Sequence, residues 1–432
     1  MSSLFKRFAV GALLLALPAV ASASSSRVQG MGIPGDYIRD YTGIYTYVSG
    51  ITGVGSLVYG ELGDTRFNST INPNPVTSDR QVGAVLGNLW DGRYGTWGVH
   101  LREQTPALGQ ADAFGSPNVG GFGADPNTHT NQAFDVMWGQ RFGTTSLGVR
   151  IERSYFALET SIPGVTTTLK YDVPVAGLGG AGNLARNIFG IQGGVGFELN
   201  PSSTLEAAVL WQTRDFEAST TGGTRQEEDG TSSWQVAGRM FWEWQPNVMV
   251  VPVVKFHSFD LGQTTTPPAG AATNADNSLS GWEAGVAGNW TIGSNDLFVL
   301  GLTFAQNRYE TQEDLFGLST SVPGVTFAAD HKVTESLTPM VFAGLETNLF
   351  SWLTARFGAQ KGWFTNIKIE DATQEAKISS SPFSMELGLG IKLGSLQVDG
   401  VLNPTFPQTL GGLMSQTPGY ITFPKVTATY AF

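Results

Sequence analysis

Few residues of this sequence have types and spacings that could support catalysis. The chain contains four histidines and no cysteine. His257 is followed directly by Ser258, but neighbouring residues of a strand point to opposite faces, so they cannot form a base and nucleophile pair. Asp330 and His331 are adjacent and could serve a hydrolase, although acids in polar segments are usually only solvated. We therefore predict that the protein is not an enzyme.

Acidic side chains gather in two polar stretches, where they could attract a divalent cation. One stretch runs from Glu227 to Asp229, and the other runs from Glu310 to Asp314. Acids in such segments are usually solvated, and no histidine or cysteine stands beside them as a further ligand. The sequence predicts neither a metal site nor a cofactor.

Charged residues of both signs recur within otherwise apolar or aromatic segments. Side chains at alternate positions of a strand lie on one face, so these charges would share a face opposite the apolar one. Charges are costly in lipid but tolerable around water or in pairs. This face should therefore line a wet interior or, alternatively, a filled interior in which the charges pair across strands. The residues predicted to line the pore are Arg102, Asp135, Arg141, Arg150, Arg214, Arg239, Glu243, Lys255, Glu283, Arg356, Glu386 and Lys392.

The segments that carry these charges have the alternation of amphipathic strands. In SPFSMELGLGIKLG, apolar side chains from Phe383 to Leu393 alternate with polar or small ones. In SSWQVAGRMFWEWQ, Trp234, Trp242 and Trp244 share the apolar face. Such strands are oily on one side and polar on the other.

The composition favours a membrane setting. Hydrophobic residues make up 41% of the chain and charged residues only 14%, whereas soluble domains have about a quarter charged residues. Without cysteine, an exported chain must be stabilised by packing or by a closed hydrogen-bonded sheet. The net charge of -11 argues against nucleic acid as a partner, because phosphates demand a basic face.

The connections between the strands alternate between short turns and long polar, glycine-rich segments. Short turns fall at sites such as residues 200–202 and 293–295, and long segments at sites such as residues 158–187 and 311–334. Eight long and seven short connections join 16 strands and leave both termini on the short-turn side. We predict an all-β fold, a transmembrane antiparallel β-barrel with short periplasmic turns and long extracellular loops. Fourteen strands is the fallback, because residues 54–62 alternate poorly.

The two chain ends indicate where the protein resides. Residues 1–23 combine Lys6 and Arg7 with an apolar run and the small-residue site Ala21-Ser22-Ala23, which is typical of a cleaved secretory signal peptide. The last seven residues, VTATYAF, form an alternating strand that stops on Phe432. We therefore expect the terminus itself to be a strand of the barrel.

These features together resemble Gram-negative outer-membrane porins over nearly the whole mature chain. The resemblance implies a location in the cell outer membrane, contact with its lipid and lipopolysaccharide, and small solutes as cargo. In that family the aromatic C-terminal strand is read by the barrel assembly machinery, which implies that Tyr430 and Phe432 form an assembly signal. Assembly into a homo-oligomer is left open.

Residues 24–53 differ from the rest. Ile33, Tyr37, Tyr41, Ile44 and Val48 recur at helical spacing, which predicts a short helix in the periplasm or packed in the lumen ahead of a barrel of residues 54–432. The start of this segment at Gly30-Met31-Gly32 resembles the N-terminal segment of fatty-acid-transporter-like barrels, which implies a gated hatch as the alternative.

Three functions are compatible with these observations. The polar interior favours a channel for passive diffusion of small hydrophilic solutes. The N-terminal resemblance favours a transporter of hydrophobic substrates, and any closed barrel could serve as a non-transport anchor or assembly partner in the envelope. For the diffusion channel, we expect residues 159–187 to narrow the pore, with residues 103–131 as a rival.

Overall fold

The computed structural model describes fourteen stretches of the chain, and every structural statement below refers to them. They are residues 24–64, 78–87, 89, 92–102, 132–157, 160–161, 168–169, 182–220, 224–229, 232–293, 296–312, 326–402, 423 and 425–432. The predicted signal peptide and the rival loop at 103–131 lie outside the described residues, as does most of the predicted constriction segment at 159–187. No helix within the described residues is long and apolar enough to cross a membrane.

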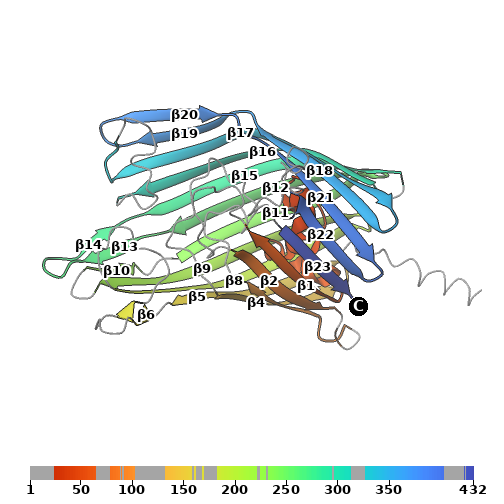
Figure 1. Cartoon of the computed structure of the whole chain (residues 1–432), viewed down its shortest axis with the longest axis horizontal. Helices are drawn as coiled ribbons and strands as arrows, with labels where there is room; N and C mark the ends of the chain where they lie inside the picture. Colours follow the sequence, from red (N-terminus) through yellow and green to blue (C-terminus); the bar gives the residue numbers. More distant parts are fainter. Residues whose placement is uncertain are drawn as a thin grey trace, which may run out of the picture.

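Sixteen antiparallel strands form the wall of a closed barrel, as the sequence predicted (Figure 1). Each strand pairs with the next wall strand along the chain, and the last strand pairs with the first, from Leu57↔Ala431 to Gly63↔Lys425. The terminal strand therefore closes the barrel and leaves no open edge. The wall strands are β1 (Leu57–Asp64), β2 (Ser78–Leu86), β3 (Thr96–Arg102), β4 (Gln132–Phe142), β5 (Thr145–Ala157), β8 (Gly182–Asn200), β9 (Ser203–Thr220), β11 (Ser232–Gln245), β12 (Val248–Asp260), β15 (Ser278–Ile292), β16 (Asp296–Thr311), β17 (His331–Phe350), β18 (Leu353–Gly362), β21 (Phe383–Leu393), β22 (Leu396–Leu402) and β23 (Lys425–Ala431).

Short additional strands extend the wall at the end opposite the C-terminus, which we call the rim (Figure 1). They are β10 (Arg225–Glu228), β13 (Gln263–Thr266), β14 (Thr273–Ala275), β19 (Thr365–Glu370) and β20 (Glu375–Ser380), and β6 (Thr160–Ser161) pairs separately with β7 (Thr168–Leu169). The sequence predicted loops over most of these residues, so it underestimated the regular structure there. Threonine-rich and charged residues can form strands when a neighbour supplies the hydrogen bonds, as β9 and β13 do for β10.

The outer face of the wall is apolar. Along β3 the side chains alternate strictly between buried and exposed, and the exposed ones include Trp97, Val99 and Leu101. Trp211, Trp234, Trp242, Trp244, Trp282 and Trp352 are exposed in the same way on other strands. A closed barrel with an outward band of aromatic and aliphatic side chains is the arrangement that lipid solvates.

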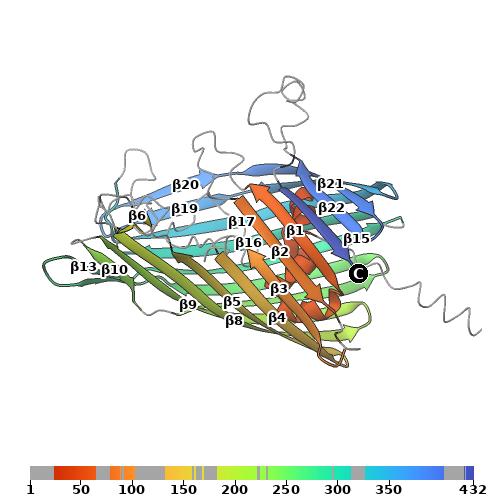
Figure 2. The same ribbon diagram turned by 60° about the horizontal axis from the view of Figure 1, so that its bottom comes forward.

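Residues 24–53 lie inside the barrel, and we call them the lumenal segment. They form one short helix, α2 (Ser25–Gly30), followed by the 3-10 turns η1 (Gly35–Tyr37), η2 (Tyr41–Tyr45) and η3 (Val48–Gly53). Both ribbon views place this segment between opposite walls, towards the end where the C-terminus lies (Figure 2). The segment thus holds one short helix, while the residues of the predicted helical pattern, from Ile33 to Val48, form 3-10 turns.

Candidate functional site

The lumenal segment contacts nearly the full circumference of the wall. Helix α2 packs against β18, β21, β22 and β23, whereas η3 packs against β3, β4, β5, β8 and β9 on the other side. Between them, η1 packs against β12. The segment therefore crosses the lumen from one side to the other.

Local chemistry explains why the segment turns repeatedly instead of forming one helix. Ser24 caps α2 by accepting a hydrogen bond from the Arg27 amide at 3.1 Å, and Asp40 caps η2 by accepting from the amides of Thr42 and Gly43. Gly32 has a φ of 58°, a conformation that side chains disfavour. The chain is thereby bent to follow the lumen.

Glycines of the wall let the backbone of the lumenal segment approach closely. A Cβ atom added at Gly148 would lie 2.5 Å from the Val48 carbonyl oxygen, and one at Gly358 would overlap the Met31 carbonyl oxygen. At Gly388 a Cβ would lie 2.9 Å from the Cα of Gly30. Since no side chain fits at these points, the inner wall is shaped to hold this segment.

A buried ionic cluster fastens the start of the segment to the wall. Arg27 contacts both carboxylate oxygens of Glu346 at 2.7 Å, and Arg356 bonds the same carboxylate at 2.7 Å. Arg356 also pairs with Asp399 at 2.8 Å, and Ser24 donates to Asp399 at 2.8 Å. Two guanidinium groups thus balance two carboxylates, which such burial requires.

A second cluster fastens the middle of the segment. Asp36 pairs with the buried Lys255, whose ammonium nitrogen lies 3.7 Å from Glu283. Arg239 pairs with Glu206 at 2.6 Å and donates to the Asp36 carbonyl oxygen at 3.1 Å. These contacts join η1 to β11 and β12 and, through them, to β9 and β15.

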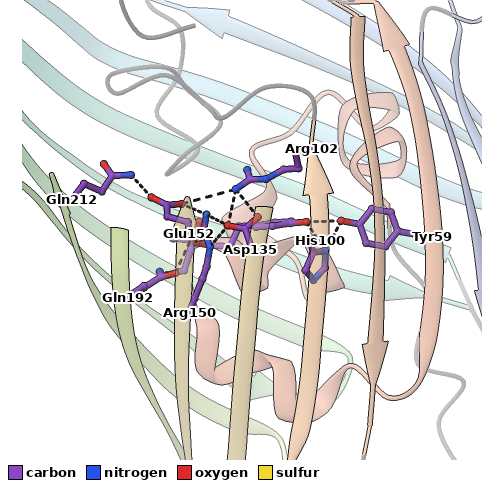
Figure 3. Close-up of polar contacts among 10 residues, drawn as sticks. Tyr59, His100, Arg102, Asp135, Arg150, Glu152, Gln192 and Gln212 are labelled. Atoms are coloured by element: carbon purple, nitrogen blue, oxygen red, sulfur yellow. Dashed lines mark hydrogen bonds and ion pairs between the residues drawn. The ribbon is translucent and has the colours of Figure 1, made fainter. Parts of the chain in front are cut away.

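A third cluster surrounds Asp135 on β4 (Figure 3). Arg102 and Arg150 both bond its carboxylate, at 2.9 and 2.8 Å. Arg150 also pairs with Glu152 and donates to the carbonyl oxygen of Tyr45 at 2.9 Å. The cluster therefore supports η2 as well as the wall.

Aromatic and amide groups complete the third cluster. The hydroxyl groups of Tyr45 and Tyr59 both lie within hydrogen-bonding distance of His100 Nδ1, at 2.8 and 2.6 Å. Gln192 donates to the Thr46 carbonyl oxygen at 2.7 Å, and the Gln212 amide donates to Glu152. His100 is thus held in a packed polar network and is not presented to a substrate.

The predicted pore-lining residues fall into three groups. Those brought together at the lumenal segment are Arg102, Asp135, Arg150, Arg239, Lys255, Glu283 and Arg356. Arg141 forms a largely exposed pair with Glu198, Glu243 and Lys392 are exposed, and Glu386 is half-buried. The side chain of Arg214 lies outside the described residues.

Some residues of the site were not among those predicted. Ser24 and Asp36 belong to the lumenal segment, and Glu61 lies on the first strand, where it pairs with Lys425 at 2.8 Å. Asp36 lies between Ile33 and Tyr37 of the helical pattern, but that pattern could not indicate which strand it faces. Poor alternation in residues 54–62 concealed Glu61.

Comparisons with known proteins detect only distant structural likeness. No protein-family model matches the sequence, and no curated protein matches it. A Pseudomonas aeruginosa FadL homologue is 10% identical with a TM-score of 0.45, covering 95% of this chain and 98% of its own. The Pseudomonas putida toluene transporter TodX is 8% identical with a TM-score of 0.39 over 94% and 96%, and CdiB from Escherichia coli is 12% identical with a TM-score of 0.43 over 87% and 63%. At these values the likeness assigns neither a family nor a cargo.

Proposed function

We propose that the protein is an outer-membrane transporter of small apolar or amphipathic molecules, gated by the lumenal segment. The observation that carries this proposal is the occupied lumen. The segment contacts opposite walls, and the wall charges around it are buried and paired. An open diffusion channel would instead keep such charges in water, so passage requires the segment to move.

An apolar row near the rim supports a hydrophobic cargo. Phe259, Leu279, Tyr309, Val333 and Ile369 are paired in register across adjacent strands β12, β15, β16, β17 and β19. All five are buried and belong to one cluster. They occupy the inward face at the entrance side of the barrel, where a polar channel would carry polar groups. We call these five residues the apolar row.

A second candidate, diffusion of small hydrophilic solutes, is favoured by one observation. The inner face of the wall carries arginine, lysine, glutamate and aspartate side chains from many strands. Displacement of the lumenal segment would expose these charges to water and create a polar channel.

One pair of measurements separates the two candidates. Purified protein in planar bilayers should show small and infrequent conductance, and in liposomes it should speed the entry of a labelled apolar compound such as toluene. A large, steady conductance together with ordinary toluene entry would replace the transporter with the diffusion channel. Absence of both conductance and accelerated toluene entry would contradict the transporter and the diffusion channel alike.

We propose further that the terminal strand directs assembly. Tyr430 and Phe432 are exposed, their rings stack with centroids 6.4 Å apart, and the Phe432 amide donates to the Ser56 carbonyl oxygen at 3.2 Å. Phe432→Ala should lower the amount of heat-resistant folded barrel without affecting export. Normal folded levels in outer-membrane fractions would contradict an assembly signal.

A further inference from the structure

A row of polar side chains crosses the inner wall one step below the apolar row. Gln235, His257, Gly281, Asn307 and Glu335 are consecutive cross-strand partners on β11, β12, β15, β16 and β17. Since adjacent strands lie about 4.8 Å apart, these four polar side chains form one lateral row across five strands. We call Gln235, His257, Asn307 and Glu335 the polar row.

Each member of the polar row keeps a buried polar atom that no group among the described residues satisfies. These atoms are Gln235 Nε2, His257 Nε2, Asn307 Oδ1 and Glu335 Oε1. Asn307 lies within reach of both His257 and Glu335, but no contact of these four atoms has the geometry of a hydrogen bond. Gln235 and Glu335 are each 2% exposed. Buried polar groups normally have partners, and leaving one unsatisfied is costly.

Because Gly281 has no side chain, the side chains of His257 and Asn307 can both occupy the space above it. A Cβ added there would lie 2.6 Å from His257 Nε2 and would overlap Asn307 Oδ1. The gap in the row is therefore filled by imidazole and amide groups from both sides. This brings an acceptor oxygen and a ring nitrogen towards each other on the wall.

Other unsatisfied atoms in the described part of the barrel do not form such a row. Tyr47 Oη also has no partner, but Tyr47 lies under the Arg239 guanidinium, 4.1 Å from its ring centroid, within the lumenal segment. His100 Nε2 belongs to a side chain whose Nδ1 is already engaged. Only the polar row combines several such atoms with an adjoining apolar surface.

We propose that the polar row binds the head group of an amphipathic ligand whose head donates hydrogen bonds, such as an alcohol or amine, while the apolar row holds its hydrocarbon body. This inference rests on the proposed function. Glu335 and Asn307 offer acceptor oxygens, and His257 Nε2 accepts when the proton is on Nδ1. Gln235 Nε2 is the donor that a hydroxyl oxygen could use.

The charges nearby select against a carboxylate head. On the next row down, Lys255 is the single cation, and it already faces Asp36 and Glu283. The polar row and the row below it therefore carry the carboxyl group of Glu335 and the Asp36–Lys255–Glu283 group, in which one ammonium group already faces two carboxylates. A further negative charge would meet repulsion and offer no new pairing, so a fatty alcohol should bind more tightly than the acid of equal length.

The test measures binding of radiolabelled decanol, decylamine, decanoate and decane to the full chain in lipid nanodiscs, with empty nanodiscs subtracted. Decanol or decylamine should bind at least about tenfold more tightly than decanoate or decane, which corresponds to about 1.4 kcal/mol. In Glu335→Leu, the affinity for decanol and decylamine should fall to near the affinity for decane. Glu310→Leu is the matched control, because Glu310 lies at the rim end of the neighbouring strand β16, its side chain is 40% exposed, and it pairs with Arg308 and Lys332.

The outcomes separate this inference from the proposed function. Equal binding of decane and decanol, insensitive to Glu335→Leu, would retain the transporter and overturn the head-group site. Tighter binding of decanoate would also overturn it. Absence of binding and entry for every apolar probe would instead remove the proposed function. Should Glu335→Leu fail to fold, His257→Phe tests the same row with the same expected loss.

Discussion

Two levels of the lumen solve the problem of buried polar groups in opposite ways. Around the lumenal segment, the charged groups of the wall are matched, as where Arg27 and Arg356 share Glu346. Towards the rim, the polar row retains several atoms without partners beside the apolar row. Ion pairs across the lumen show that the level of the lumenal segment is occupied by the protein's own chain, although single polar atoms such as Tyr47 Oη lack partners there too. A row of such atoms beside an apolar surface indicates a part arranged for a ligand.

The difference also indicates which level should move. Paired buried charges hold a structure in place, and removing one partner is strongly destabilising. The lumenal segment is held by such pairs together with glycine contacts, so its release needs several contacts to break together. The polar row can gain a partner without breaking any ion pair. A ligand would therefore bind at the rim before the segment moves.

The largest effect should follow from substitutions that prevent the lumenal segment from packing against the wall. In Gly358→Ala and Gly148→Ala the added methyl group meets the backbone of Met31 or Val48, and backbone cannot rotate away. We expect the segment to be displaced and single-channel conductance to rise from rare openings to a persistent current.

Strand β8, the neighbour of β5, offers a matched control for this change. A Cβ at Gly193 meets nothing within 4 Å, so Gly193→Ala should behave as the parent protein. Equal currents in all three variants would mean that the segment does not close the lumen. The rim should be unaffected, so binding of decanol should persist in the open variants.

A smaller effect should follow from breaking one buried pair. Lys255→Met leaves Asp36 and Glu283 without their cation, and their side chains are at most 5% exposed. The loss should be about 3–5 kcal/mol in the free energy of unfolding, seen as a lower urea midpoint in lipid. Arg141→Met removes the exposed partner of Glu198 and should cost at most about 1 kcal/mol.

Restoring the balance of charge sharpens this prediction. Adding Asp36→Asn and Glu283→Gln to Lys255→Met should recover part of the lost stability, because no uncompensated charge remains. Equal losses for Lys255→Met and Arg141→Met would show that the buried and the exposed ion pair contribute equally to the free energy of unfolding.

The wall of this barrel was largely predictable from the sequence, because alternation and connection length are local signals. Closure of the last strand on the first followed from the requirement that lipid leaves no edge unpaired. The lateral rows were not predictable. His257 and Asn307 are 50 residues apart in the sequence numbering, and only the strand register places them on either side of Gly281.

That the lumen is occupied also could not be predicted from local sequence patterns. Helical spacing from Ile33 to Val48 predicted a short helix in the periplasm or in the lumen, but the fit of this segment to the wall depends on its three-dimensional shape. Gly148 and Gly358 look like any other strand glycine until the opposing backbone is known. Similarly, the interior charges were predicted to be either solvated or paired, and only their positions in the folded barrel distinguish these states.

The smallest effect concerns Asp371, a rim carboxylate that is satisfied, and it tests whether the rim is preformed. It lies in the turn between β19 and β20, where it accepts from the amides of Thr373 and Gln374 at 2.7 and 2.9 Å and from that of Ala328 at 2.9 Å. These backbone donors hold the pKa of Asp371 well below its usual range. The bond to Ala328 fixes the residue beside Phe327, which is 3% exposed in the cluster containing the apolar row.

Because its folded pKa is depressed, Asp371 should stabilise this contact fully above the ordinary aspartate pKa of about 3.9. The contribution is lost only as the pH falls through the lower, folded value. Amide exchange at Ala328, corrected for its intrinsic rate, should therefore be flat from about pH 5 to pH 8. Asp371→Asn should raise it a few-fold while leaving residues 24–53 unchanged. If exchange rose throughout the lumenal segment as well, the rim and the segment would form one cooperative unit, and the comparison of two separate levels would fail.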